Sequence, residues 1–169
     1  MKDYIESGMN FIPLFINNNS LYVEKSQFYK NLGEGVRTVE FICLKQSNKL
    51  YFIEAKNTAP KPSNKEDFTK YCDEQLHKMQ HSMDLFISRE VGVNKDFGNE
   101  FPDCFIGKKF SEYKIIFLLI IKNHKKEWCN LVLNGLQRKL IALRKIWKID
   151  IAVWNGETAL EKRFISEII

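Results

Sequence analysis

Runs of apolar residues divide the chain into stretches that are typical of strands and helices. Residues 36–45 and 49–56 are both rich in β-branched and aromatic side chains, and a short polar turn at 46–48 separates them. This spacing predicts a β-hairpin with a short connection. An earlier stretch, residues 21–29, is the candidate for a first strand.

Beyond the hairpin, the pattern alternates between helix and strand. Residues 65–89 carry apolar side chains at intervals of three and four, the period of an amphipathic helix. A near-continuous apolar run at 113–121 is typical of a central strand that is covered on both faces. The other predictions, in chain order, are an irregular insertion at 91–112, a helix at 126–148, a strand at 149–154, a turn at Asn155-Gly156 and a closing helix at 157–168.

The order of these elements predicts an α/β fold with a mixed central β-sheet flanked by helices. The chain has 169 residues, which suits one domain, because single cores usually run to about 100–200 residues. We therefore expect residues 1–169 to form a single domain. Hydrophobic residues make up 44% and charged residues 28%, which excludes the disordered and collagen-like classes.

Charge and hydropathy bear on location and partners. The N-terminus has no apolar segment of the kind found in signal peptides. The longest apolar run, residues 115–121, is far shorter than the ~20 residues that a membrane helix needs. These features predict a cytoplasmic protein with no membrane partner. The formal net charge of +5 permits a polyanionic partner without requiring one.

The candidate chemistry lies in the predicted hairpin. Side chains alternate along a strand, so Glu54 and Lys56 share a face. If Lys45 pairs with Lys49 across the turn, Glu40 stands opposite Glu54 with Cβ atoms about 5 Å apart. A bulge in the turn would shift this pairing by one residue.

Two facing carboxylates destabilise an apolar hairpin unless a cation compensates their charge. Mg²⁺ suits this role, since it takes oxygen ligands from one or two carboxylates. A lysine on the same face can orient a water molecule or stabilise negative charge on a phosphate. The combination predicts metal-assisted hydrolysis of a phosphodiester. The alternative interpretation is an exposed strand face that carries mixed charges.

The segment Val39-Glu40-Phe41-Ile42, followed by Leu50-Tyr51-Phe52-Ile53-Glu54-Ala55-Lys56, resembles the core of the PD-(D/E)XK nuclease superfamily. That superfamily carries an acid on one strand, Glu-x-Lys on the next, and then a helix. Its members are mostly Mg²⁺-dependent nucleases. The resemblance covers residues 33–86 and implies a restriction-endonuclease-like core.

The resemblance also implies roles for individual residues. Glu40 and Glu54, with the backbone carbonyl of Ala55, would hold Mg²⁺ or Mn²⁺, and Lys56 would be the catalytic lysine. Many members add a polar residue from the following helix. Gln75 lies at the edge of the apolar stripe and is the candidate for this catalytic role, although it also fits a simple boundary position.

The expected function is Mg²⁺-dependent cleavage of nucleic acid, with DNA favoured, and the family analogy suggests phage defence or DNA repair. Lys61 and Lys65, close to the Glu-x-Lys strand, are predicted to bind nucleic-acid phosphates. The family's usual first acid is Asp, and here it is Glu40. This departure favours the alternative, a catalytically inactive nuclease-like domain that binds nucleic acid or a protein partner.

Other titratable residues leave two questions open. His77 and His81, with Asp73, are spaced so that a helix would place them on one face, which is a possible zinc site. An N-terminal acid often lies near the metal in the superfamily, and Glu24 and Glu34 are the candidates.

Overall fold

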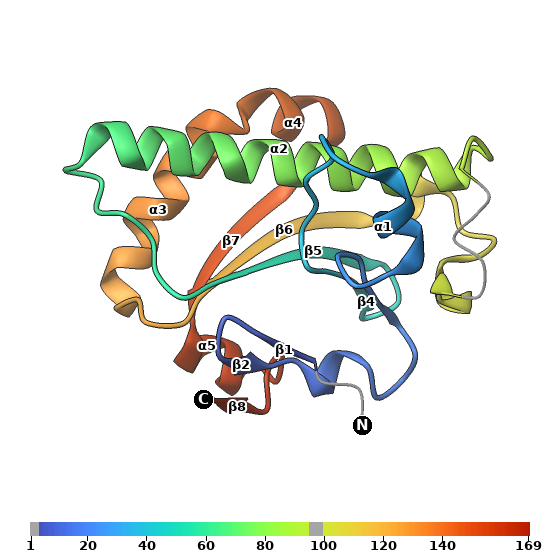
Figure 1. Ribbon diagram of the computed structural model, residues 1–169, viewed down its shortest axis with the longest axis horizontal. Coiled ribbons are helices and arrows are strands. Elements are labelled where there is room, and N and C mark those ends of the chain that lie inside the picture. The colour runs from blue at the N-terminus through green and yellow to red at the C-terminus, as the bar shows by residue number, and fades with distance from the viewer. Residues whose placement is uncertain (1–3, 95–99) are drawn as a thin grey trace.

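A five-stranded sheet runs through the middle of the computed structural model, which describes residues 4–94 and 100–169 (Figure 1). The strand order is β3 (Ser20–Tyr22), β4 (Phe41–Lys45), β5 (Lys49–Lys56), β6 (Lys114–Ile121) and β7 (Asp150–Asn155). The pairs β3–β4 and β4–β5 are antiparallel, whereas β5–β6 and β6–β7 are parallel. The predicted mixed sheet is therefore confirmed.

Helices cover one face of this sheet, and a second layer covers the other (Figure 1). The first layer contains α2 (Lys65–Glu90), α3 (Lys126–Lys139) and α4 (Ile141–Trp147). These helices are the crossovers that parallel pairing of β5, β6 and β7 requires. The opposite face packs against the N-terminal segment and α5 (Gly156–Glu161). Phe52 and Phe117 belong to the core on the helical face, and Ile53 and Phe164 to the core on the other face.

The two ends of the chain meet in a small sheet that the sequence did not predict. It contains β1 (Ile5–Glu6), β2 (Met9–Asn10) and β8 (Glu167–Ile168). The predicted closing helix at 157–168 is therefore wrong in its second half, since α5 ends at Glu161 and Arg163 has a left-handed φ of 57°. Because the chain leaves the helix after Glu161, Phe164 and Ile165 can be buried and β8 can pair with β2.

Long, strongly periodic elements match their predictions closely. The strand at 49–56 coincides with β5, and the helix at 65–89 is extended by one residue in α2. The long helix predicted at 126–148 is divided at Leu140 into α3 and α4. Within the described residues, no helix has the length and apolar character needed to cross a bilayer.

Short elements differ more from prediction. The first strand at 21–29 is wrong beyond Tyr22, because Ser26 caps a new helix, α1 (Gln27–Leu32), by accepting a hydrogen bond from Tyr29 N. β4 begins only at Phe41. The expected turn at Asn155-Gly156 is the start of α5, where the Asn155 side chain accepts from Thr158 N. The insertion predicted at 91–112 contains the short helices η3 (Asp103–Phe105) and η4 (Phe110–Glu112), and its residues 95–99 lie outside the described residues. Another short helix, η1 (Ile12–Leu14), lies near the N-terminus.

Candidate functional site

The β4–β5 hairpin sets the relative position of the two predicted acids. Lys45 pairs with Lys49 and Phe41 with Ile53, so the predicted register is confirmed. Gln46 and Ser47 adopt left-handed φ values in the turn. Glu40 directly precedes β4 and therefore stands beside the end of β5 that carries Glu54.

Both carboxylates lie inside the protein, on the face of the sheet that α2 covers. Glu40 is 5% exposed and Glu54 is fully buried. Oε2 of Glu40 accepts a hydrogen bond from the Ala55 backbone N–H at 2.7 Å. The Ala55 carbonyl, predicted as a metal ligand, accepts from the Ser7 hydroxyl at 3.1 Å.

The electrostatic surroundings of Glu40 favour an additional positive charge. Burial and the neighbouring Glu54 carboxylate raise the pKa of Glu40 well above its ordinary value, and they outweigh Lys78 and the Ala55 N–H. Two buried carboxyl groups this close do not ionise together without compensation. A proton or a cation between them is therefore favoured.

Lys56 lies between two acids at the rim of this site. Its Nζ is 3.0 Å from Oε1 of Glu54 and 3.0 Å from Oε1 of Glu74. Burial and the Lys78 ammonium lower the pKa of Lys56, but the carboxylates of Glu54 and Glu74 outweigh both effects, so the pKa lies above its ordinary value. The group is therefore an ammonium that donates hydrogen bonds, rather than a base that removes a proton from water.

Lys78, from α2, belongs to the site, and no role was predicted for it from the sequence. Its Nζ lies 2.8 Å from Oε1 of Glu54, 3.1 Å from Oε1 of Glu24 and 3.7 Å from Oε1 of Glu40. Burial lowers the pKa of Lys78, yet these carboxylates raise it overall. Lys78 thus compensates the charge of the carboxylates, a role for which the sequence predicts a divalent cation.

The sequence feature that could have identified Lys78 is its spacing from Gln75. Residues three apart share a helix face, so a helix that turns Gln75 toward the site also turns Lys78 there. Glu24 is the N-terminal acid that reaches the site through Lys78, whereas Glu34 is exposed. The positions of Lys78 and Glu24 depend on how α2 and the segment after β3 pack against the hairpin.

The same face of α2 presents two further polar groups to the interior. Gln75 is fully buried, and neither amide atom has a hydrogen-bond partner among the described residues. The buried hydroxyl of Tyr71, one turn earlier, also lacks a partner there. Burial, then Glu54, Glu74 and Glu40, raise the pKa of Tyr71, so its ring lies near the same carboxylates. Buried groups of this kind require a polar ligand or water.

Ser82 fixes the segment that carries Glu40 against α2. Its Oγ accepts a hydrogen bond from Val39 N at 2.9 Å and donates to the Lys78 carbonyl at 2.7 Å. Both contacts are buried. The position of Glu40 is thereby tied to the helix that carries Lys78.

The structure does not bring the predicted phosphate-binding lysines or histidines into this cluster. Lys61 and Lys65 are exposed, near and at the start of α2, and their role stays a prediction. Asp73 forms an ion pair with Lys139.

The rings of His77 and His81 are 6.2 Å apart, and Nδ1 of His81 accepts from Arg37 N. Among residues 4–94 and 100–169, no three or more His, Cys, Asp or Glu side chains are arranged as a metal-binding group.

Comparison of the chain with models of protein families, with curated proteins and with solved structures gives no match. The geometry of the site is therefore the guide to function, above all the cluster of Glu40, Glu54, Lys56, Gln75 and Lys78.

Proposed function

We propose that the protein is a Mg²⁺- or Mn²⁺-dependent nuclease, with a restriction-endonuclease-like core, that hydrolyses phosphodiester bonds of nucleic acid, DNA being favoured. The observation that carries this proposal is the meeting of three groups at one corner of the sheet. The carboxylates of Glu40 and Glu54 are buried side by side, and the Lys56 ammonium contacts Glu54 at 3.0 Å. The order of these residues along the hairpin follows the PD-(D/E)XK pattern.

The donor set suits a hard divalent cation. Carboxylate and amide oxygens are its preferred ligands, and Gln75 has a buried amide oxygen without a partner among the described residues. Glu40, Glu54 and the Ala55 carbonyl are the proposed ligands. When bound there, the cation supplies Lewis-acid polarisation of a phosphoryl oxygen and a lowered pKa for coordinated water.

The protein's own groups have distinct tasks in this proposal. Glu40 and Glu54 provide the negative charge that concentrates cations at the site. The Lys56 ammonium donates hydrogen bonds to the attacking water or to a phosphate oxygen as negative charge develops. The Gln75 amide orients water through its own donor and acceptor.

A second candidate is a catalytically inactive nuclease-like domain that binds nucleic acid or a protein partner. The observation that favours it is the position of Lys78 Nζ, within 4 Å of Glu24, Glu40 and Glu54. An ammonium there balances the buried carboxylates without a divalent cation. The presence of Glu40 where the family usually has Asp points in the same direction.

Cleavage assays test the first candidate. Labelled single-stranded and duplex DNA and RNA are incubated with Mg²⁺ or Mn²⁺ and the wild type, Glu54→Ala or Lys56→Ala. We expect each substitution to lower the rate by roughly a hundredfold or more, since each removes a transition-state contact. Lys70→Ala, at an exposed position of α2, is the matched control and keeps full activity.

The two candidates predict different results for the wild type. Metal-dependent cleavage that persists in both Glu54→Ala and Lys56→Ala would reject the assigned roles. Binding of nucleic acid without cleavage in either metal would favour the inactive domain.

A further inference from the structure

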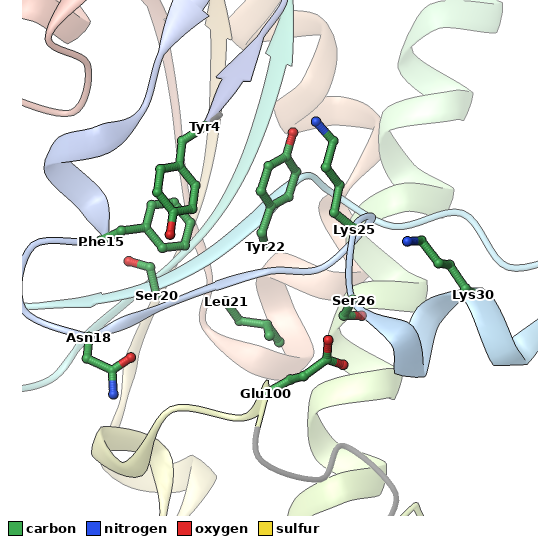
Figure 2. A pocket seen from close by; sticks show the side chains of 10 residues that line it. All are labelled: Tyr4, Phe15, Asn18, Ser20, Leu21, Tyr22, Lys25, Ser26, Lys30 and Glu100. Carbon is green, nitrogen blue, oxygen red and sulfur yellow. The ribbon is translucent and has the colours of Figure 1, made fainter. Parts of the chain in front are cut away.

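A cavity of about 610 Å³ opens beside the edge strand β3, apart from the acidic cluster (Figure 2). This volume lies within the range of about 300–1,000 Å³ that is usual for small-ligand sites. Its walls differ in character. Three aromatic rings form one side, from Tyr4, Phe15 and Tyr22, and the amino groups of Lys25 and Lys30 lie on the other.

Two of the three rings on the aromatic side are stacked, and the third is tilted against them. The rings of Tyr4 and Phe15 stack with centroids 3.8 Å apart and an interplanar angle of 11°. The Tyr22 ring lies next to both, with each centroid 6.4 Å away. Tyr4 and Phe15 are only half-buried. Surfaces of this kind stack nucleobases without regard to sequence, because every base has a π-face.

The opposite side carries positive charge. Lys25 and Lys30 are exposed, and Lys25 Nζ lies 4.8 Å from the centre of the Tyr22 ring and 3.4 Å from Oε1 of Glu6. The carboxylate of Glu100 also lines the cavity, but it accepts hydrogen bonds from the first backbone N–H groups of α1, including Gln27 N at 2.9 Å. The negative charge of Glu100 is thereby partly balanced by the N-terminus of α1. Lysine ammonium groups, in turn, bind phosphate as point charges.

We propose that this cavity binds a nucleotide of single-stranded nucleic acid, with its base against Tyr4 and Phe15 and its phosphate between Lys25 and Lys30. A base in a duplex is stacked between its neighbours, so only an unpaired base presents a free face to the rings. The inference rests on the proposed nuclease function, and it identifies the substrate of that nuclease as an unpaired strand.

The cavity and the acidic cluster are adjacent along the chain. Lys25 directly follows Glu24, whose carboxylate contacts Lys78 at 3.1 Å, and successive Cα atoms are only about 3.8 Å apart. The aromatic wall nevertheless belongs to the core on the face of the sheet opposite the two acids, so a bound strand reaches Glu54 only by passing around the edge strand β3.

Fluorescence anisotropy with a labelled ten-residue oligothymidine, in the presence of a chelator, tests this assignment. We expect the double variant Lys25→Ala/Lys30→Ala to weaken binding roughly tenfold and to lower the slope of log K against log salt by about 0.7 per lysine. The matched control is Lys126→Ala/Lys145→Ala, which removes the same charge from exposed positions of α3 and α4 and should change both quantities much less.

The aromatic wall is tested separately. Tyr4→Leu keeps an apolar side chain against Phe15 but removes the ring, and we expect it to weaken binding by roughly tenfold as well. An abasic strand of equal length should bind wild type more weakly than oligothymidine. Equal binding by the abasic strand, or equal losses in the cavity and control double variants, would overturn the assignment.

The binding assay is independent of cleavage, because chelator removes the metal. Weak binding in the cavity variants combined with no metal-dependent cleavage by wild type would support the nucleotide site and reject the nuclease. Cleavage that depends on Glu54 and Lys56, together with unchanged binding in Lys25→Ala/Lys30→Ala, would reject the nucleotide site alone.

Discussion

Gln75 is fully buried on α2, and neither of its amide atoms has a hydrogen-bond partner among the described residues. An unpaired buried amide costs about 1–3 kcal/mol, whereas an apolar side chain of similar size avoids this penalty. We therefore expect Gln75→Leu to raise the free energy of unfolding by about 1 kcal/mol in chelator. The same substitution should weaken Mg²⁺ binding. Urea denaturation and calorimetry measure the two effects.

Gln80→Leu is the matched control for this prediction, because Gln80 is exposed on the same helix. Its free energy of unfolding should change by no more than about 0.5 kcal/mol. Lower stability of Gln75→Leu in chelator would contradict the prediction and would mean that the amide stabilises the metal-free fold.

His124 gives the protein a predictable response to acid. Burial lowers the pKa of His124 below its usual value, and its Nε2 is buried without a hydrogen-bond partner among the described residues. The unfolded chain therefore binds the proton more tightly than the folded one. The stabilisation is complete above the unfolded pKa of about 6.5 and is lost as the pH falls through the lower folded value.

We expect His124→Gln to show a shallower loss of stability than wild type as the pH is lowered from about 7 to 5. Urea denaturation midpoints at several pH values measure this difference. His77→Gln, at an exposed position of α2, is the control. Parallel curves for wild type and His124→Gln would show that this histidine does not contribute.

At the scale of elements, the contact between α2 and the segment before β4 positions the acids. Ser82 Oγ accepts from Val39 N, and Val39 is fully buried. Ser82→Ala leaves that N–H unpaired, so we expect a loss of about 1–3 kcal/mol in the free energy of unfolding. Because Glu40 follows Val39, the cleavage rate should also fall, even under conditions in which the variant is fully folded.

The control for this prediction is Thr69→Ala, since the Thr69 hydroxyl also donates to a helical carbonyl but lies on the exposed side of α2. It should alter stability and cleavage very little. Normal cleavage by folded Ser82→Ala would show that the position of Glu40 does not depend on this hydrogen bond.

The elements also show which features local sequence can predict. The strand at 49–56 and the long helix that follows were predicted closely, because their apolar patterns extend over many residues. In the helix, successive turns place their apolar side chains on the same face. β8 was missed because its two residues gain their structure from pairing with β2 at the other end of the chain. Burial of Phe164 and Ile165 against the sheet likewise overrides the helical pattern of the C-terminus.

The same distinction applies to the candidate site. Glu40, Glu54 and Lys56 follow from the register of one hairpin, which short-range pairing determines. Lys78 and Glu24 join them only because α2 and the segment after β3 pack against that hairpin. Side-chain spacing gives the face of a helix, but it does not give the partner that this face meets.

For the molecule as a whole, folding and charge compensation are coupled at the site. The chain carries a formal net charge of +5, yet in the part of the chain that the structure describes, four carboxylates at the site, those of Glu24, Glu40, Glu54 and Glu74, contact two ammonium groups. The folded state therefore holds a local excess of formal negative charge within a basic protein. A cation that binds this state and not the unfolded chain must stabilise the fold.

Lys78→Met tests this coupling, because it removes an ammonium from among buried carboxylates while keeping a side chain of similar length. Breaking a buried ion pair is strongly destabilising, and since Lys56 still contacts Glu54 we expect a loss of roughly 3 kcal/mol in chelator. Mg²⁺ at about a hundred times its dissociation constant would restore up to about 2.7 kcal/mol. Thermal denaturation with and without Mg²⁺ measures both changes, and Lys70→Met, at an exposed position of the same helix, is the control. If Mg²⁺ stabilises Lys78→Met no more than it stabilises wild type, the carboxylates are compensated by an ammonium and not by a metal. That result would favour the inactive domain over the nuclease.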